Sequence, residues 1–194
     1  MINSGWGYYN IDYIILTPSV AEESFSSLVY GFEDLTLQGF SVNTDNNNQY
    51  NTALATDLTV TDAVYTEGKH SIKADFSLVG SGGQFQIRRL GAMDLTGASK
   101  ITAKVKVVPI DEGTSLEGVN VYLFSQSGEA WEDWTISDPG TVLSAVDENG
   151  FMTIMLDIGN LTTKNLIKAF GIQVRTPSGS IGQATIYVDE VTIQ

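Results

Sequence analysis

Apolar and polar residues alternate with a period of two through most of the chain, and this pattern is the strongest constraint on its fold. A strand sends successive side chains to opposite faces, so such alternation predicts strands that bury one face. Helical spacing is almost absent, and its best candidate is one short turn within Thr162–Phe170. The clearest predicted strands are Ser71–Leu78, Gln84–Leu90, Lys100–Val108, Val119–Gln126, Phe151–Ile158, Phe170–Thr176 and Ala184–Ile193.

Polar, glycine-rich turns such as Ser81–Gly83 and Pro177–Gly179 separate the predicted strands. Many short strands at this spacing indicate an all-β fold, an antiparallel β-sandwich of the jelly-roll type. The composition agrees, because only 17% of the residues are charged and 19 are glycine, whereas long helices need abundant Glu, Lys, Ala and Leu.

The formal net charge of −13 limits the possible partners. An acidic surface repels nucleic-acid phosphates and anionic membranes, so we expect neither as a partner, whereas neutral polysaccharide and Ca²⁺ remain compatible. The absence of cysteine excludes disulfides, thiolate zinc sites and a cysteine nucleophile. No apolar run is long enough to span a membrane and no signal peptide is visible, so we expect any export signal upstream in a longer precursor.

A short sequence pattern that occurs twice in the chain suggests a domain boundary near the N-terminus. Asn10–Leu16 and Tyr187–Ile193 share the pattern x-[Ile/Val]-Asp-x-[Ile/Val]-x-[Leu/Ile]. We therefore predict that residues 1–17 are the closing strand of a preceding module or an appended tail, that residues 18–28 are a linker and that residues 29–194 form the sandwich. Alternation is common in strands, so chance similarity is the alternative explanation.

Three predicted strands carry polar and aromatic side chains opposite their apolar residues. Amides and guanidinium groups suit vicinal sugar hydroxyls, and flat rings stack against the apolar faces of pyranoses. The alternative is a merely solvated polar face. The residues expected on this outer face are Gln84, Gln86, Arg88, Tyr122, Phe124, Gln173 and Arg175.

Two tryptophans three residues apart, Trp131 and Trp134, cannot share a face of a regular strand. If Ile136 is buried, alternation buries Trp134 and turns Trp131 outward. We therefore predict Trp131 as the principal sugar platform and Trp134 as a core residue. The alternative is that both rings are core.

Several segments resemble strands of jelly-roll carbohydrate-binding modules, above all the family 27-like mannan-binding modules of β-mannanases. They occur in the expected order at Tyr30–Asp34 with Gln38–Phe40, Tyr65–Ile72, Phe170–Val174 and Tyr187–Val191. Gly5–Ile14 is similar to the end of a family 35 module. Phe40 stands where many relatives carry Trp, so the resemblance implies a further aromatic contact at Phe40.

The same resemblance implies a structural Ca²⁺ that joins the first and last strands. Glu33 and Asp189 are its implied carboxylate ligands, and the Glu67–Lys69 turn, with Lys69, supplies carbonyl oxygens, which Ca²⁺ prefers. Without the resemblance, two lone acidic residues are ordinary surface residues.

The expected function is that of a non-catalytic module, which binds β-mannan and belongs to a secreted, extracellular glycan-degrading enzyme with a catalytic domain and further modules. The alternatives are the same fold binding β-glucan or xylan, and a structural or interaction domain without glycan affinity. Catalytic activity is the least favoured hypothesis, because the Glu-x-Asp-x-x-Glu strand of sandwich glucanases is absent and the sole histidine, His70, lies at a predicted turn.

Overall fold

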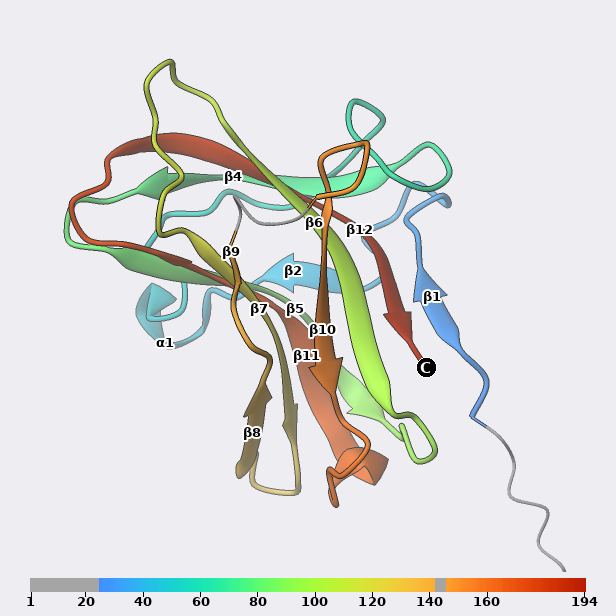
Figure 1. The fold of residues 1–194 in the computed structure, drawn as a ribbon. Coiled ribbons are helices and arrows are strands. Elements are labelled where there is room, and N and C mark those ends of the chain that lie inside the picture. Colours follow the sequence, from blue (N-terminus) through green and yellow to red (C-terminus); the bar gives the residue numbers. More distant parts are fainter. Residues whose placement is uncertain (1–24, 142–145) are drawn as a thin grey trace, which may run out of the picture.

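A computed structural model describes residues 25–141 and 146–194, which form a sandwich of two antiparallel sheets (Figure 1). The first sheet contains β1 (Leu28–Tyr30), β3 (Thr59–Thr61), β4 (Ser71–Leu78), β6 (Lys100–Pro109), β10 (Met152–Asp157) and β12 (Gly182–Ile193). The second sheet contains β2 (Phe40–Val42), β5 (Gly83–Met93), β7 (Asn120–Ser127), β8 (Asp133–Ile136), β9 (Gly140–Thr141) and β11 (Ile167–Thr176).

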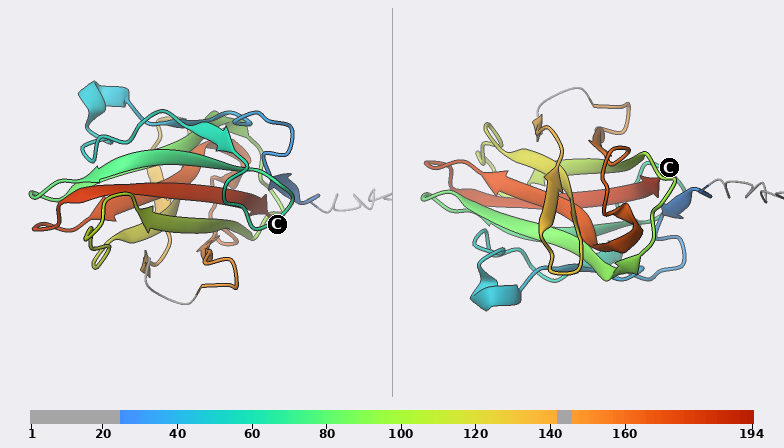
Figure 2. Two further views of the ribbon diagram at one scale, coloured as in Figure 1. Left: turned by 90° about the horizontal axis from the view of Figure 1, so that it is seen from above. Right: turned by 90° about the horizontal axis from the view of Figure 1, so that it is seen from below.

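Strand order places the long strands at the centre of each sheet. The first sheet runs β10-β6-β12-β4-β3, with β1 also paired to β12, and the second runs β2-β5-β11-β7-β8, with β9 also paired to β7. Figure 2 shows the first sheet nearest the viewer from above and the second sheet nearest from below. The predicted all-β sandwich is confirmed.

Each predicted strand overlaps an observed one, but the helical candidate is shorter than predicted. Within Thr162–Phe170, only the 3-10 turn η1 (Lys164–Leu166) is helical, and β11 begins at Ile167. The four-residue helix α1 (Asp45–Asn48) lies beside the second sheet. None of the described helices is long and apolar enough to cross a membrane.

The core lies between the sheets and is built by the alternation seen in the sequence. In β5, Phe85 and Ile87 are fully buried, and in β4 the inward residues include Ile72 and Phe76. Phe76 and Phe85 pack against each other across the sandwich, with ring centroids 4.9 Å apart. Burial of these apolar side chains is the main stabilising contribution to the fold, at roughly 1.5–3 kcal/mol for each large side chain.

Of the predicted domain boundaries, residues 1–17 and most of the 18–28 linker lie outside the described residues. The first described strand starts at Leu28, inside the predicted linker, and pairs in register with β12, as in Val29 opposite Thr192. The start and end of the described sandwich are therefore joined by neighbouring strands (Figure 1).

Candidate functional site

The outer face of the second sheet gathers the polar residues predicted from alternation. Strand β11 pairs with β5 on one side and β7 on the other, and this register fixes which outward side chains are neighbours. Gln173 lies between Gln86 and Tyr122, and Arg175 lies between Gln84 and Asn120. The outer side chains of three strands thus form cross-strand rows.

Four side-chain amides form a chain of hydrogen bonds along this face. Asn43 Nδ2 donates to Gln86 Oε1 at 2.7 Å, Gln86 Nε2 to Gln173 Oε1 at 3.5 Å, and Gln173 Nε2 to Gln84 Oε1 at 2.9 Å. Asn43, Gln86 and Gln173 are only 2–3% exposed, so these bonds satisfy polar groups that water scarcely reaches. The shared direction of the bonds orients every amide in the chain.

These amides form part of the floor of a surface groove of about 470 Å³. The groove extends from α1 at one end to the β7–β8 turn at the other. It is lined by Asn43, Asp45, Tyr50, Gln84, Gln86, Arg88, Gln126, Trp131, Trp134, Gln173 and Arg175. Six of the nine residues predicted to bind sugar are among them.

Charge in the groove is nearly balanced. Arg88 Nη2 lies 2.5 Å from Asp45 Oδ2, so this guanidinium and carboxylate neutralise each other. Arg175 lies over the ring of Tyr122, 5.0 Å from its centroid. Among the described lining residues Asp45 is the single carboxylate, and it is already paired.

Trp134 is a groove residue, so its predicted place in the core is wrong. Trp134 is 42% exposed and pairs with Gln126 in the β7–β8 ladder. Trp134 and Ile136 do share a face of β8, as alternation predicted. That face is the outer one, since Ile136 pairs with the outward Phe124.

Phe124 lies beneath Trp134 and supports it. The two rings are nearly parallel, with an interplanar angle of 13° and centroids 4.7 Å apart. Phe124 is only 1% exposed, so it underlies an aromatic surface without forming one itself. Trp134 therefore presents its outer face as a flat, supported platform.

Trp131 lies outside any strand, in the turn between β7 and β8. It is 41% exposed, as predicted, but its position comes from the turn, where its φ is +63°, and not from alternation. Positive φ is rare for a bulky residue, and such conformations cluster at functional sites. Gln126 Nε2 donates to the Trp131 carbonyl at 3.2 Å.

Two further predicted sugar contacts, Phe40 and Tyr122, do not line the groove. Phe40 is 2% exposed and packs in the core against the rings of Tyr30, Phe32 and Phe170. This packing leaves no ring face for a ligand, so the aromatic contact implied at Phe40 is not available. Tyr122 is half-buried under Arg175 and does not line the groove.

The groove also contains residues that sequence reasoning missed, namely Asn43, Asp45, Tyr50 and Trp134. Asn43 directly follows β2, and its backbone N–H donates to Gln86 O, so an outward polar residue at that strand end was a usable signal. Asp45 is the first residue of the four-residue helix α1 and Tyr50 follows that helix, and neither lies in a strand whose alternation could place its side chain. Only the folded chain brings them to the groove.

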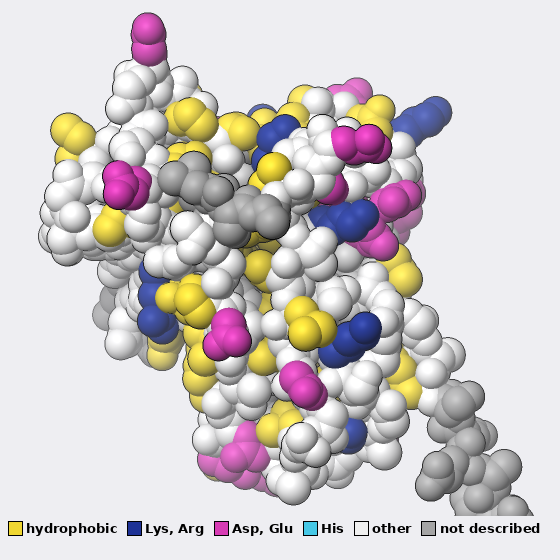
Figure 3. Space-filling view, in the orientation of Figure 1, with side chains coloured by type: hydrophobic (Ala, Val, Ile, Leu, Met, Phe, Trp, Pro, Cys, Tyr) yellow, Lys and Arg dark blue, Asp and Glu magenta, His cyan; other side chains and the backbone are white. Residues whose placement is uncertain are grey.

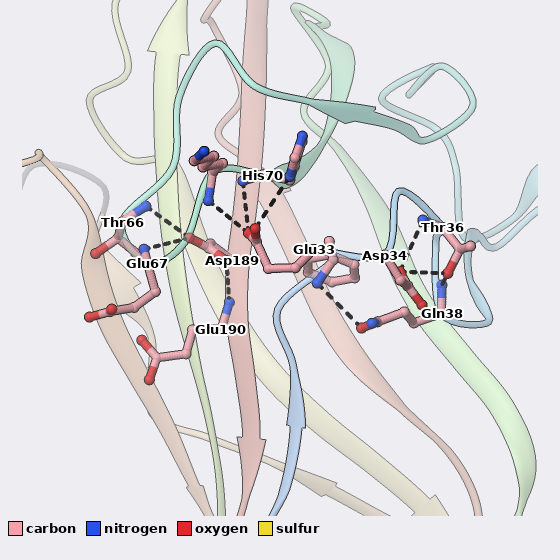
Figure 4. Close-up of polar contacts among 11 residues, drawn as sticks. Glu33, Asp34, Thr36, Gln38, Thr66, Glu67, His70, Asp189 and Glu190 are labelled. Carbon is pink, nitrogen blue, oxygen red and sulfur yellow. Dashed lines mark hydrogen bonds and ion pairs between the residues drawn. The ribbon is translucent and has the colours of Figure 1, made fainter.

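Glu33 and Asp189 both approach the segment Thr66–His70, as the resemblance implied (Figure 4). Glu33 Oε1 accepts the backbone N–H groups of Lys69 and His70 at 2.8 and 2.9 Å. Asp189 Oδ2 accepts those of Thr66 and Glu67 at 2.8 and 3.1 Å. The N–H of Lys69 holds the pKa of Glu33 below its ordinary value, whereas burial raises the pKa of Asp189.

This arrangement does not fit the implied calcium cage. Ca²⁺ needs oxygen ligands, but the turn offers both carboxylates N–H donors, and Lys69 contributes its N–H. Within residues 25–141 and 146–194, no three acidic, histidine or cysteine side chains gather where they could hold a metal ion. Calcium binding at this junction remains a prediction from the resemblance.

The face seen in Figure 3 has no single dominant charge. Acidic and basic side chains are interspersed there, and hydrophobic side chains form small separate patches among the backbone and the other side chains.

The fold is shared with solved carbohydrate-binding modules. One structure, from work on promiscuous specificity in the β-sandwich superfamily of these modules, has a TM-score of 0.63 and 21% identity, over 85% of this chain and 60% of that chain. Module CBM27-1 of Caldicellulosiruptor saccharolyticus, solved with mannohexaose, has a TM-score of 0.61 and 18% identity, over 88% of this chain and 98% of that chain. A CBM28 module specific for non-crystalline cellulose has a TM-score of 0.58 and 16% identity, over 83% of this chain and 89% of that chain.

These likenesses define the class of the fold, that of the β-sandwich carbohydrate-binding modules. No curated protein matches the sequence. The family model described as "Mannanase, galactose-binding domain-like" matches residues 30–190, and the chain belongs to this family. The resemblance to mannan-binding modules found in the sequence is thereby confirmed.

Proposed function

We propose that this chain is a non-catalytic module that binds β-mannan along the groove of the second sheet and serves a secreted glycan-degrading enzyme. The observation that carries the proposal is the pairing of two exposed tryptophans, Trp131 and Trp134, with a floor of oriented amides. Aromatic faces stack on the apolar faces of pyranoses, and amides and guanidinium groups bind their hydroxyls. No other described surface combines these features.

The balance of charge supports a neutral ligand. Arg88 and Asp45 pair with each other across the end of the groove, Arg175 is the one other charged residue of the described lining, and the amides between them are uncharged. A neutral sugar gains little from long-range attraction, so its affinity depends on stacking and on hydrogen bonds. These are the contacts that this groove offers.

The preference for mannan rests on family membership and on the mannohexaose complex of the similar module. The cellulose-specific neighbour has the same fold, which keeps β-glucan or xylan as the alternative ligand. The non-catalytic assignment rests on the groove's carboxylates. Hydrolysis of a glycosidic bond ordinarily needs two of them across the scissile bond, and the described lining supplies only Asp45.

Affinity electrophoresis tests the proposal directly. The protein is run in native gels that contain galactomannan, glucomannan, β-glucan or xylan, beside a reference protein without glycan affinity. We expect the strongest retardation in the mannan gels. Retardation only by β-glucan or xylan would move the preference to that glycan, and none in any gel would leave a structural or interaction domain. Release of reducing sugar from any polymer would contradict the non-catalytic assignment.

A further inference from the structure

Lys168 occupies an irregular position in the central strand of the groove. Ile167 and Phe170 are both fully buried, although residues three apart cannot face the same side of a regular strand. The ladders of β11 with both β5 and β7 shift register between Ile167 and Ala169. In the ladder with β7, Ile167 and Ala169 pair with the consecutive residues Ser127 and Gln126, so Lys168 is the extra residue of a β-bulge there. A bulge re-aims a side chain and is frequent beside functional sites.

The bulge directs Lys168 at the turn that carries Trp131. Its ammonium group lies over the Trp131 indole, 5.5 Å from the ring centroid, and donates a hydrogen bond to the carbonyl of Glu129. One side chain therefore holds both the backbone of the turn and the ring that projects from it. With Lys168 over one face of the indole, the other face is the one left for a ligand.

Other contacts close the turn without fixing the ring. Glu132 accepts the N–H of Ala130 at 2.7 Å, and Gly128 donates its N–H to Leu166 O at 3.1 Å. Gly128 has φ +87°, and a side chain at that position would run into the carboxylate of Glu132. These bonds set the course of the backbone, whereas among the described residues Lys168 is the one cation over the indole.

We propose that Lys168 is a positioning residue, which holds the Trp131 indole in its ligand-binding orientation without touching the ligand itself. This inference rests on the proposed function, because it assigns Lys168 a role in glycan affinity that acts through Trp131. A cation over an indole and a charge-assisted bond to the turn together restrict the ring before the ligand arrives. Such restriction lowers the entropy that binding must remove.

A double-mutant cycle on the whole chain tests this role. Lys168→Met keeps the length of the side chain but removes the charge and the donor, and we expect galactomannan affinity to fall about threefold to tenfold. Lys168→Arg should retain most of the affinity. Lys73→Met, which makes the same charge change on β4 of the other sheet, is the matched control and should leave affinity unchanged.

The decisive comparison uses the Trp131→Ala variant, which lacks the indole. In Trp131→Ala, the further change Lys168→Met should cost less than about twofold, because the ring on which it acts is gone. Additive losses would overturn the inference, since Lys168 would then contribute to affinity independently of Trp131.

A second readout does not depend on glycan binding. In a Trp6→Phe, Trp134→Phe background, Trp131 is the sole tryptophan, so selectively excited indole emission comes from it alone. Lys168→Met should increase acrylamide quenching of Trp131, and Lys168→Arg should not. Unchanged quenching would overturn the inference even if the wild type binds mannan, whereas increased quenching in a protein that binds no glycan would support it and contradict only the proposed function.

Discussion

The indole of Trp134 lies parallel to the buried ring of Phe124, with 13° between the ring planes and 4.7 Å between their centroids. The stack ties a surface residue of the short strand β8 to the more central strand β7. It leaves the outer face of the indole open to the groove. One aromatic pair therefore links the stability of this edge of the sheet to the surface available for a ligand.

Removing Trp134 should affect both properties. In Trp134→Ala we expect galactomannan to bind at least about tenfold more weakly, and the free energy of unfolding to fall by about 1–3 kcal/mol as Phe124 becomes exposed. Isothermal titration calorimetry and urea denaturation measure the two effects. Thr135→Ala, on the same strand but on the opposite face, is the control for binding. Full affinity in Trp134→Ala would show that this ring is not a platform.

Removing Trp131 should separate binding from stability. The ring is 41% exposed and leaves no cavity in the core, so Trp131→Ala should hardly change the melting temperature. Loss of a stacking surface should still weaken galactomannan binding at least about tenfold, which corresponds to about 1.4 kcal/mol. A large fall in melting temperature with unchanged affinity would instead make Trp131 a structural residue of the turn.

Breaking the chain of amides should destabilise the protein and weaken binding together. Gln86→Leu leaves Asn43 Nδ2 and Gln173 Oε1 without their partner in a nearly water-free floor, a loss of about 1–3 kcal/mol in unfolding free energy. Urea denaturation should detect it, and affinity electrophoresis should show weaker retardation. Gln183→Leu, an exposed glutamine of β12, is the matched control and should change neither. A fully stable Gln86→Leu protein would mean that the floor tolerates an apolar side chain.

The junction of the first and last strands should hold without Ca²⁺. Glu33 and Asp189 already accept backbone N–H groups, so we expect the same melting temperature for Ca²⁺-loaded protein before and after treatment with EDTA. Calorimetry with verified loading provides the measurement. A fall of several degrees on chelation would instead support the structural Ca²⁺ that the resemblance implies.

The two carboxylates of the junction should respond to pH in opposite directions. The pKa of Glu33 is lowered in the folded protein by the N–H of Lys69, so its stabilising contribution is present above the ordinary value of 4.5 and is lost as the pH falls through the folded value. Wild type should therefore be more stable than Glu33→Gln at neutral pH, and the two should converge in acid. Denaturant midpoints across this range measure the difference.

Burial raises the pKa of Asp189, so ionisation of this carboxyl costs stability as the pH rises above the ordinary value of 3.8. The stability advantage of wild type over Asp189→Asn should then shrink with rising pH, the reverse of the Glu33 series. Parallel pH profiles for the two variants would contradict the opposite environments found in the structure.

The sequence alone determined the sandwich and much of its groove floor. Alternation is a local property of a strand, and it placed Gln84, Gln86 and Gln173 on the outer face opposite the buried Phe85 and Ile87. Alternation also placed Trp134 and Ile136 correctly on one face of their strand. It could not tell which face was buried, because an edge strand with few apolar residues gives no such signal.

Only the tertiary structure decided the ends of the groove and the roles of its aromatic residues. Trp131 takes its place from a turn with positive φ, and Asp45 reaches Arg88 from the single-turn helix α1, so neither position follows from strand periodicity. Phe40 lies in the core because it packs against Phe170 of β11, a strand of the same sheet that is distant in sequence. Strand patterns are set by residues a few positions apart, whereas burial, aromatic stacking and ion pairing depend on which segments the fold brings together.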